Sequence, residues 1–237
     1  MQKEYWAIVP AAGVGKRMQA DRPKQYLPLF NKTVIEHTLD RLLSMNEISG
    51  VVLSISEGDE YWPSLNYKSD KPILIAAGGK ERSDSVFNAL QLLAKQNLTP
   101  ENICALVHDA ARPCVRPDDI KNLIKKSHLN DSGGLLALPV RDTMKRANDD
   151  NNQINKTVVR DGLWHALTPQ LFRLDLLISA LKSAVDNNQT VTDDASAMEL
   201  AGYSPLLVEA HEDNLKITRA FDLQLAELYL LNQKSNL

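Results

Sequence analysis

Cysteine is scarce in this sequence: only Cys104 and Cys114 occur among its 237 residues. Their positions match neither a metal-ligand spacing nor a disulfide framework, so we expect both to be reduced side chains in or near the core. The sequence also lacks an apolar run long enough to span a bilayer, and its first residues lack the apolar stretch of a signal peptide. We therefore expect a cytoplasmic protein that does not bind membranes.

An excess of positive charge is absent as well. Lysine and arginine total 27 against 30 aspartate and glutamate residues, which leaves a formal net charge of −3. We expect no nucleic-acid partner from this balance, and an anion-binding site requires a local concentration of basic residues. The length suits one large domain, and 43% hydrophobic residues are ordinary for a globular protein.

Short apolar runs alternate with longer segments of helical periodicity. The runs are nearly continuous in apolar character, which is typical of strands buried on both faces of a parallel sheet. They are residues 6–9, 51–55, 73–77, 104–107 and 135–140. Between them, residues 34–43 and 86–93 each place their apolar side chains on one helical face. This order predicts an α/β fold, with a doubly wound, mostly parallel, Rossmann-like sheet.

A polar segment, 141–162, interrupts the alternation. It contains two β-compatible stretches, 142–146 and 156–160, around an Asn/Asp-rich centre, which is typical of a long hairpin. We expect residues 140–163 to project as an arm from a single domain that spans 1–237. Such an arm needs a surface to pack on, so we expect a homodimer; a disordered surface loop is the alternative.

The sequence after the arm continues the α/β pattern. It predicts a helix after Pro169, a strand near residues 205–208, and a closing helix with Phe221, Leu225 and Leu228 on one face.

A basic loop, residues 10–24, directly follows the first strand. Its small residues let backbone N–H groups approach phosphate oxygens; they are Pro10, Ala11, Ala12, Gly13 and Gly15. Four cations follow within nine residues: Lys16, Arg17, Arg22 and Lys24. Ligands of open α/β sheets bind at the carboxyl ends of strands, so this loop predicts a triphosphate site. A tight turn into a helix is the alternative. Arg17 and Lys24 are the best candidates for stabilising charge on phosphorus, whereas Lys16 and Arg22 are equally suited to solvent.

Asp109 ends another expected strand and should face the same crevice. Its carboxylate suits the Mg²⁺ that accompanies a triphosphate, although a cap before Pro113 would also explain it. We assign His108 no catalytic role. The turn 78–82 ends the third expected strand, and by sequence alone it is an ordinary strand-to-helix turn.

These segments belong to a series of blocks that resemble one enzyme family. The blocks are Ala11-Ala12-Gly13-x-Gly15-x-Arg17-Met18, Pro23-Lys24-Gln25-Tyr26, Gly78-Gly79-x-x-Arg82-x-x-Ser85-Val86, His108-Asp109-Ala110-Ala111-Arg112-Pro113, Pro139-Val140-x-Asp142-Thr143, Trp164-x-x-x-Thr168-Pro169-Gln170, Thr192-Asp193-x-Ala195-Ser196 and Asn214-x-Lys216-x-Thr218. In this order they cover nearly the whole chain and resemble the 2-C-methyl-D-erythritol 4-phosphate cytidylyltransferases of the non-mevalonate isoprenoid route.

The resemblance implies roles for residues that the pattern alone would leave unassigned. It implies Asp109 as the metal ligand and Arg17, Lys24 and Lys216 as catalytic cations. It implies nucleotide binding, with cytosine at the 78–85 turn, by Pro10, Ala11, Ala12, Gly13, Gly15, Lys24, Gly79, Arg82, Ser85 and Ala110. It implies binding of the sugar-alcohol phosphate by Arg112, Thr143, Arg160, Thr168, Thr192 and Lys216. Thr143 and Arg160 lie on the arm and are therefore candidates for the partner subunit's site.

The expected reaction is direct displacement at the α-phosphorus of CTP by a phosphate oxygen of methylerythritol phosphate. This nucleophile is already an anion, so no general base is needed, and no Ser-His-Asp or paired-carboxylate motif is seen. A cytidylyltransferase for another polyol phosphate, such as ribitol 5-phosphate, is the closest alternative. Met144-Lys145-Arg146 and Trp164 favour methylerythritol phosphate. A nucleotide sensor without chemistry is a second alternative, but it would not need cations at the leaving group.

Overall fold

A central sheet organises the computed structural model, which describes residues 3–13, 18, 21–96, 98–128, 130, 132–148 and 152–235. Within these residues seven strands form the sheet in the order β11-β7-β10-β6-β1-β4-β5. Their bounds are β1 Glu4–Pro10, β4 Ile48–Ile55, β5 Ile73–Ala77, β6 Ile103–Val107, β7 Gly134–Pro139, β10 Trp164–Arg173 and β11 Leu206–Glu209. The five apolar runs expected to be strands are thus all confirmed, as is the strand near residues 205–208.

The sheet is mostly parallel because β1 pairs in parallel with both β4 and β6, β4 with β5, and β7 with β11. Only β10 runs antiparallel to its neighbours, β6 and β7, among the described strands. The carboxyl ends of β1, β5 and β6 therefore open at the same edge of the sheet, where ligands of such folds bind.

The strand β10 was not expected from the sequence. We predicted a helix after Pro169, but Pro169 lies inside this strand and the helix α5 (Leu174–Asp186) begins five residues later. A proline within a run argues against a central strand, because it has no N–H for the ladder. Here the register of β10 with β7 is interrupted between Ala166 and Gln170, so the proline falls where the ladder is already broken.

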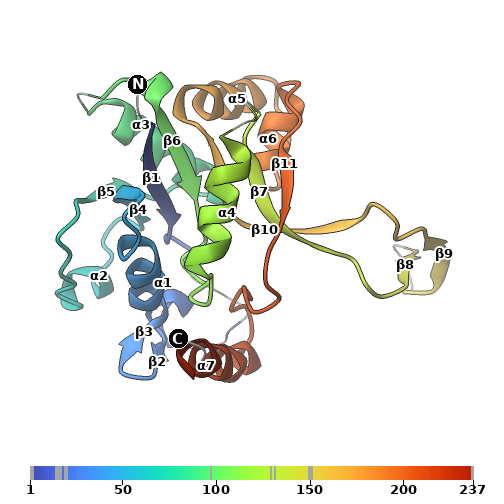
Figure 1. The fold of residues 1–237 in the computed structure, drawn as a ribbon, viewed down its shortest axis with the longest axis horizontal. Helices are drawn as coiled ribbons and strands as arrows, with labels where there is room; N and C mark the ends of the chain where they lie inside the picture. The colour runs from blue at the N-terminus through green and yellow to red at the C-terminus, as the bar shows by residue number, and fades with distance from the viewer. Residues whose placement is uncertain are drawn as a thin grey trace.

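Helices cover both faces of the sheet (Figure 1). On one face, α1 (Val34–Leu43) and α4 (Pro117–Ser127) pack their apolar sides into one core cluster. On the other, α3 (Arg82–Ala94), α5 and α6 (Asp194–Leu200) pack into a second cluster. The helical faces expected in 34–43 and 86–93 are the buried faces of α1 and α3. The doubly wound fold is therefore confirmed.

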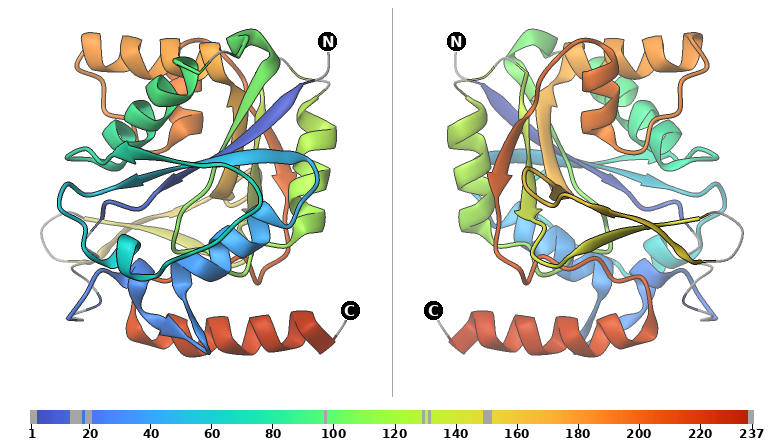
Figure 2. Two further views of the ribbon diagram at one scale, coloured as in Figure 1. Left: turned by 90° about the vertical axis from the view of Figure 1, so that its left-hand side faces the viewer. Right: turned by 90° about the vertical axis from the view of Figure 1, so that its right-hand side faces the viewer.

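The closing helix, α7 (Ala220–Ser235), lies across one end of the molecule (Figure 2). Its buried residues are Ala226, Leu230 and Gln233. The sequence placed Phe221, Leu225 and Leu228 on one face of this helix, but Phe221 is 70% exposed and Leu228 is 58% exposed. The helix has apolar residues on more than one side, so their spacing did not identify the buried one.

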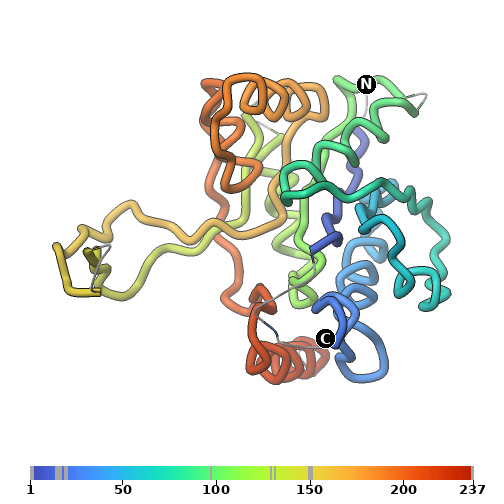
Figure 3. The backbone as a smooth tube through the Cα atoms, turned by 180° about the vertical axis from the view of Figure 1, so that it is seen from behind, coloured from blue at the N-terminus to red at the C-terminus, as the bar shows by residue number. Residues whose placement is uncertain are grey.

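Residues 140–163 leave the body as an extended arm, seen from opposite sides in Figures 1 and 3. Its tip is an antiparallel pair, β8 (Met144–Ala147) and β9 (Ile154–Val158), which confirms the expected hairpin. The remaining short elements are β2 (Pro28–Leu29), β3 (Lys32–Thr33), α2 (Tyr61–Ser64) and two 3-10 turns at Lys24–Tyr26 and Pro100–Asn102. In the part of the chain that is described, no helix has the length and apolarity needed to cross a membrane.

Candidate active site

A cleft of about 300 Å³ opens at the carboxyl ends of β1, β5 and β6. Three chain segments that follow these strands meet there, together with the 24–25 turn and Lys216. The lining residues are Pro10, Ala11, Ala12, Gly13, Lys24, Gln25, Gly79, Lys80, Glu81, Arg82, Ser85, Asp109, Ala110, Ala111 and Lys216. Eleven of these are residues to which the sequence assigned a role, so distant motifs are brought to one place.

Two carbonyl groups of the loop after β1 are held by side chains. Nε2 of Gln25 donates to the Ala11 carbonyl at 2.5 Å, and Oγ of Ser56 donates to the Ala12 carbonyl at 2.8 Å. The backbone N–H groups of Ala12 and Gly13 make no hydrogen bond to another described residue. Because backbone N–H groups that share a concavity attract anions, this arrangement suits phosphate oxygens.

The turn after β5 packs directly against that loop. A Cβ added to Gly78 would lie 2.2 Å from Cβ of Ala12 and 3.0 Å from the Ile55 carbonyl oxygen. The hydroxyl of Ser85, in the first turn of α3, accepts a hydrogen bond from the Gly79 N–H at 2.9 Å. Ser85 thus lines the cleft and also holds the glycine turn in place.

Two lysines from opposite ends of the chain enter the cleft. Nζ of Lys24 donates to the Ile217 carbonyl at 2.9 Å, which ties the 24–25 turn to the segment between β11 and α7. Nζ of Lys216 lies 2.9 Å from Oδ2 of Asp109. The net-acidic chain therefore concentrates positive charge locally, as its composition required.

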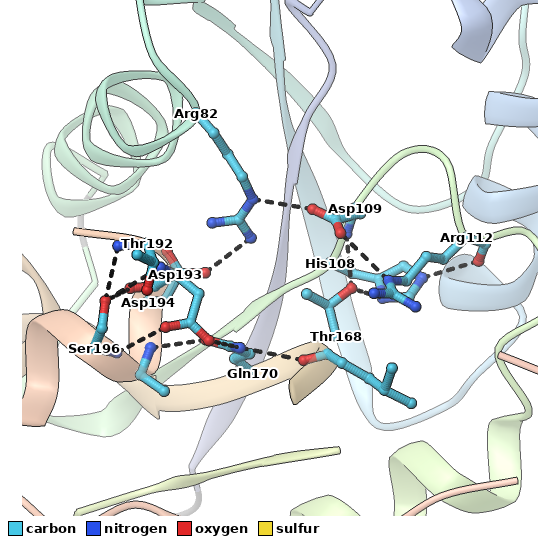
Figure 4. Close-up of polar contacts among 12 residues, drawn as sticks. Arg82, His108, Asp109, Arg112, Thr168, Gln170, Thr192, Asp193, Asp194 and Ser196 are labelled. Carbon is cyan, nitrogen blue, oxygen red and sulfur yellow. Dashed lines mark hydrogen bonds and ion pairs between the residues drawn. The ribbon is translucent and has the colours of Figure 1, made fainter. Parts of the chain in front are cut away.

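Asp109 is the carboxylate on which three cations converge. Oδ1 accepts from Nε of Arg82 at 3.0 Å, and Oδ2 accepts from Nε of Arg112 at 3.3 Å (Figure 4). Nζ of Lys216 also lies 2.9 Å from Oδ2. Burial alone would raise the pKa of Asp109, but the charges of Arg82, Lys216 and Arg112 outweigh it and hold that pKa below its usual range. The carboxylate is therefore ionised throughout the neutral range.

The donor set of Asp109 fits a divalent cation that arrives with phosphates. A carboxylate has roughly four lone-pair sites, and the three cations occupy three of them. One site on Oδ1 remains. Mg²⁺ is commonly held by one or two carboxylates plus substrate phosphates and waters, so the absence of a larger acidic cluster among the described residues does not conflict with it.

A buried network behind Asp109 fixes its position. The Asp109 N–H donates to Oγ1 of Thr168 at 3.1 Å, and the same hydroxyl lies 3.1 Å from Nδ1 of His108. Nη1 of Arg112 donates to the Asn214 carbonyl at 2.7 Å. His108 is fully buried and burial lowers its pKa to about 4, so it is a neutral structural residue, as expected from the sequence.

The other residues with sequence-assigned roles either are not described by the structure or lie outside the cleft. Gly15, Lys16 and Arg17 are not among the residues that the structure describes. Arg112 and Thr168 are buried behind the cleft, whereas Thr192 lines a neighbouring hollow that shares Glu81 and Arg82 with it. Thr143 and Arg160 are exposed on the arm and do not line this cleft. Arg22 is paired with its neighbour Asp21 at 3.1 Å.

Three residues that hold parts of the site in place were given no role from the sequence. Gln25 and Ser56 hold the carbonyls of the loop after β1, and Asp194 forms an ion pair with Arg82 at 2.9 Å. Gln25 and Asp194 lie within or beside recognisable blocks, so their positions were visible. Ser56 follows a strand without any motif, and only the folded chain brings it to Ala12.

Comparisons with known proteins identify the family of this chain. A family model, IspD: 2-C-methyl-D-erythritol 4-phosphate cytidylyltransferase, matches residues 5–232. The 2-C-methyl-D-erythritol 4-phosphate cytidylyltransferase of Aliivibrio fischeri (strain MJ11) is 52% identical over 96% of this chain and 94% of its own. That of Alteromonas mediterranea is 53% identical over 94% of this chain and 92% of its own.

Solved structures lead to the same family. The Francisella tularensis 2-C-methyl-D-erythritol 4-phosphate cytidylyltransferase superposes with a TM-score of 0.82 at 36% identity, over 96% of this chain and 100% of that one. The Thermus thermophilus protein of the same name gives 0.76 at 27% identity, over 96% and 98%. Because the family model matches residues 5–232 and the relatives are about half identical over nearly the whole chain, the chain belongs to the 2-C-methyl-D-erythritol 4-phosphate cytidylyltransferase family.

Proposed function

We propose that this protein transfers CMP from CTP to 2-C-methyl-D-erythritol 4-phosphate, giving 4-CDP-2-C-methyl-D-erythritol and pyrophosphate in the non-mevalonate isoprenoid route. The observation that carries the proposal is the convergence of Lys24, Lys216 and Arg82 with the ionised Asp109 at one cleft of the family's fold. This set suits a reaction in which charge develops on phosphates and no proton has to be removed.

The chemistry follows from that set of charges. A phosphate oxygen of the acceptor forms a bond to the α-phosphorus of CTP, the bond to the β-phosphate oxygen breaks, and pyrophosphate leaves with the electron pair. Lys24 and Lys216, with Arg17, stabilise the negative charge that builds up on the transferring group and the leaving group. The N–H groups of Ala12 and Gly13 orient the triphosphate, and Gly79, Ser85 and Ala110 form the wall beside the nucleotide.

Asp109 would hold the divalent cation that the family's chemistry uses. When bound, Mg²⁺ supplies neutralising charge for the phosphates. Asp109 suits this task because its cation partners keep it ionised while one acceptor site on Oδ1 remains.

The second substrate requires residues from outside the cleft of one chain. Arg112 and Thr168 support the site from behind, and Thr192 lies in the adjoining hollow beside Arg82. Thr143 and Arg160 lie on the arm, so we assign them to the site of a second subunit. We propose that each chain is a single domain and that two chains form a homodimer through their arms, residues 140–163. The cytoplasm is the proposed location, because both cysteines are free and buried, as suits a reducing compartment.

The activity is tested by measuring pyrophosphate release from CTP and Mg²⁺ with each candidate acceptor. We expect release with methylerythritol phosphate and loss of release when a chelator removes Mg²⁺. Release with ribitol 5-phosphate alone would replace the proposed acceptor. CTP binding without release with either acceptor would favour a nucleotide sensor.

A further inference from the structure

Asp194 is a buried residue of the site that no motif singled out. It begins α6, and its side chain is 1% exposed. Oδ2 accepts a hydrogen bond from Nη2 of Arg82 at 2.9 Å, whereas Oδ1 has no hydrogen-bond partner in the described part of the chain (Figure 4). One carboxylate oxygen is thus buried without a hydrogen bond, which lowers the stability of the folded state.

Stability does not account for such a residue. Moving two opposite charges from water into the interior costs about as much as their attraction returns, and apolar replacements of buried pairs are often neutral or stabilising. The half-paired Asp194 is therefore more readily explained by what it does to Arg82, which lines the cleft.

Arg82 divides one edge of its guanidinium between two carboxylates. Nε donates to Oδ1 of Asp109 at 3.0 Å, and Nη2 donates to Asp194. Elsewhere in this chain the same edge serves a single carboxylate. Arg116 directs both Nε and Nη2 to Oδ2 of Asp213, at 2.8 and 2.7 Å. At Arg116, where no second acceptor among the described residues holds either donor, the planar edge of the guanidinium closes on one carboxylate.

The way Arg82 shares its donors between two carboxylates determines how many acceptor sites of Asp109 stay open. Arg112 and Lys216 both donate to Oδ2, and Nε of Arg82 uses one site on Oδ1. Only the second site on Oδ1 remains. If Nη2 of Arg82 were released, it would join Nε on this oxygen, as both donors of Arg116 share Oδ2 of Asp213, and would crowd the position left for the cation.

We propose that Asp194 is a positioning residue: by holding Nη2 of Arg82, it reserves the last acceptor site of Asp109 for the divalent cation. The inference rests on the proposed function, since it concerns the cation that accompanies CTP. Asp194 acts through Arg82 and touches neither substrate nor cation. Loss of its charge allows Arg82 to compete with the cation for Asp109.

The matched pair Asp194→Asn and Asp193→Asn tests this role. Asp194→Asn keeps the shape of the side chain but weakens its hydrogen bond to Arg82. The Mg²⁺ concentration for half-maximal rate should therefore rise about five- to tenfold, whereas kcat at saturating Mg²⁺ should stay within about twofold of the wild-type value. Asp193→Asn removes the same charge one residue away. Its amide oxygen can still accept the Ser196 N–H that caps α6, so of the hydrogen bonds to described residues the substitution removes only the one from Nε2 of Gln170. This control should leave the Mg²⁺ dependence unchanged.

A binding measurement separates this inference from the proposed function. Mn²⁺ binding to the protein with CTP, followed by electron paramagnetic resonance, needs no acceptor and no turnover. Asp194→Asn should weaken Mn²⁺ binding by the same five- to tenfold, and Asp193→Asn should not. If the wild type binds Mn²⁺ and CTP but does not use methylerythritol phosphate, the proposed function fails while this titration still decides the role of Asp194.

Several outcomes would overturn the inference. The inference is contradicted if Asp194→Asn binds Mn²⁺ as tightly as the wild type and needs no more Mg²⁺ for half-maximal rate. This holds even if kcat or the thermal midpoint of unfolding falls. If Asp194→Asn does not fold, Arg82→Lys provides the test, because an ammonium cannot close on a carboxylate with a planar edge. Arg82→Lys should bind Mn²⁺ at least as tightly as the wild type, and weaker binding would contradict competition by Arg82.

Discussion

Asp109 and His108 are neighbours in the chain, yet they take opposite charge states in the same buried environment. Burial would raise the pKa of Asp109, but Arg82, Lys216 and Arg112 reverse that effect. Burial lowers the pKa of His108, and the opposing contributions of the Arg112 carbonyl and Asp109 do not overcome it. At the residue scale, the nearest charges decide which buried group stays ionised.

His108 should make the fold sensitive to mild acid. Its pKa falls from 6.5 to about 4 on folding, so the unfolded chain binds the proton first. The stability that depends on neutral His108 is complete above pH 6.5 and is lost as the pH falls toward 4. Between pH 7 and 5 this amounts to about 2 kcal/mol of the free energy of unfolding.

Urea denaturation at pH 7 and pH 5 checks this, with His108→Gln as the comparison. The variant is less stable at pH 7 because it loses hydrogen bonds to Thr168 and the Arg112 carbonyl, but its loss on acidification should be about 2 kcal/mol smaller. Asp109 titrates at lower pH and does not contribute in this window. Equal losses in the two proteins would contradict the assignment.

Lys24 should be required for chemistry but not for folding. Lys24→Ala removes a cation that we propose stabilises the transferring phosphates, so we expect kcat to fall by about two to three decades, equivalent to roughly 3–4 kcal/mol of barrier. Steady-state kinetics with CTP and methylerythritol phosphate measure the effect, and circular dichroism checks the fold. Lys121→Ala, at an exposed lysine of α4, is the charge-matched control. Near-normal turnover in Lys24→Ala would refute the assignment.

At the scale of elements, the cleft depends on two connections that touch each other. The loop after β1 and the turn after β5 meet at Ala12 and Gly78, where the space is too small for a second Cβ. Glycine is therefore needed at position 78 for close approach, since no positive φ is recorded there.

Gly78→Ala should separate the turn from the loop. The added Cβ would lie 2.2 Å from Cβ of Ala12, so we expect a loss of about 1–3 kcal/mol in the free energy of unfolding and weaker CTP binding. Calorimetry of unfolding and of CTP binding measures both. The double variant Gly78→Ala/Ala12→Gly removes the nearer of the clashing atoms and should recover part of both losses. No recovery would mean that the contact with the Ile55 carbonyl, at 3.0 Å, dominates.

At the scale of the whole molecule, the arm is separated from the cleft that it is proposed to serve. Arg160 and Thr143 are exposed on the arm, while Lys24 and Asp109 lie in the body. If the arm of one subunit completes the site of the other, each active site combines residues of two chains.

Mixing two inactive variants tests this arrangement. Lys24→Ala lacks a functional cleft and Arg160→Ala lacks a functional arm. A mixed dimer has one site with both defects and one with neither, and half of randomly formed dimers are mixed, so about a quarter of wild-type activity should return. The two variants are unfolded and refolded together, and each alone is the control. Activity no higher than that of the separate variants would place Arg160 in its own subunit's site or outside any site.

Much of the fold followed from local patterns. Runs buried on both faces, such as 104–107 and 51–55, are apolar except for Ser54 because they lie inside a parallel sheet, so their strands were predictable. The strand β10 was not predictable, because Pro169 suits a strand only where the ladder is interrupted, and that interruption is a property of its pairing with β7. The exposed side of α7 was likewise decided by what the helix packs on, at Ala226 and Leu230.

The sequence by itself determined the family, the α/β architecture, the hairpin and most cleft residues, because motifs at strand ends carry their position and chemistry together. Only the tertiary structure decided how these residues interact. Asp109 carries three cation partners, Ser56 reaches Ala12, and Asp194 divides the donors of Arg82. These contacts join residues far apart in the chain, up to 112 positions for Arg82 and Asp194. Charge and hydrogen bonding act over a few ångströms, so they depend on distances that exist only in the folded protein.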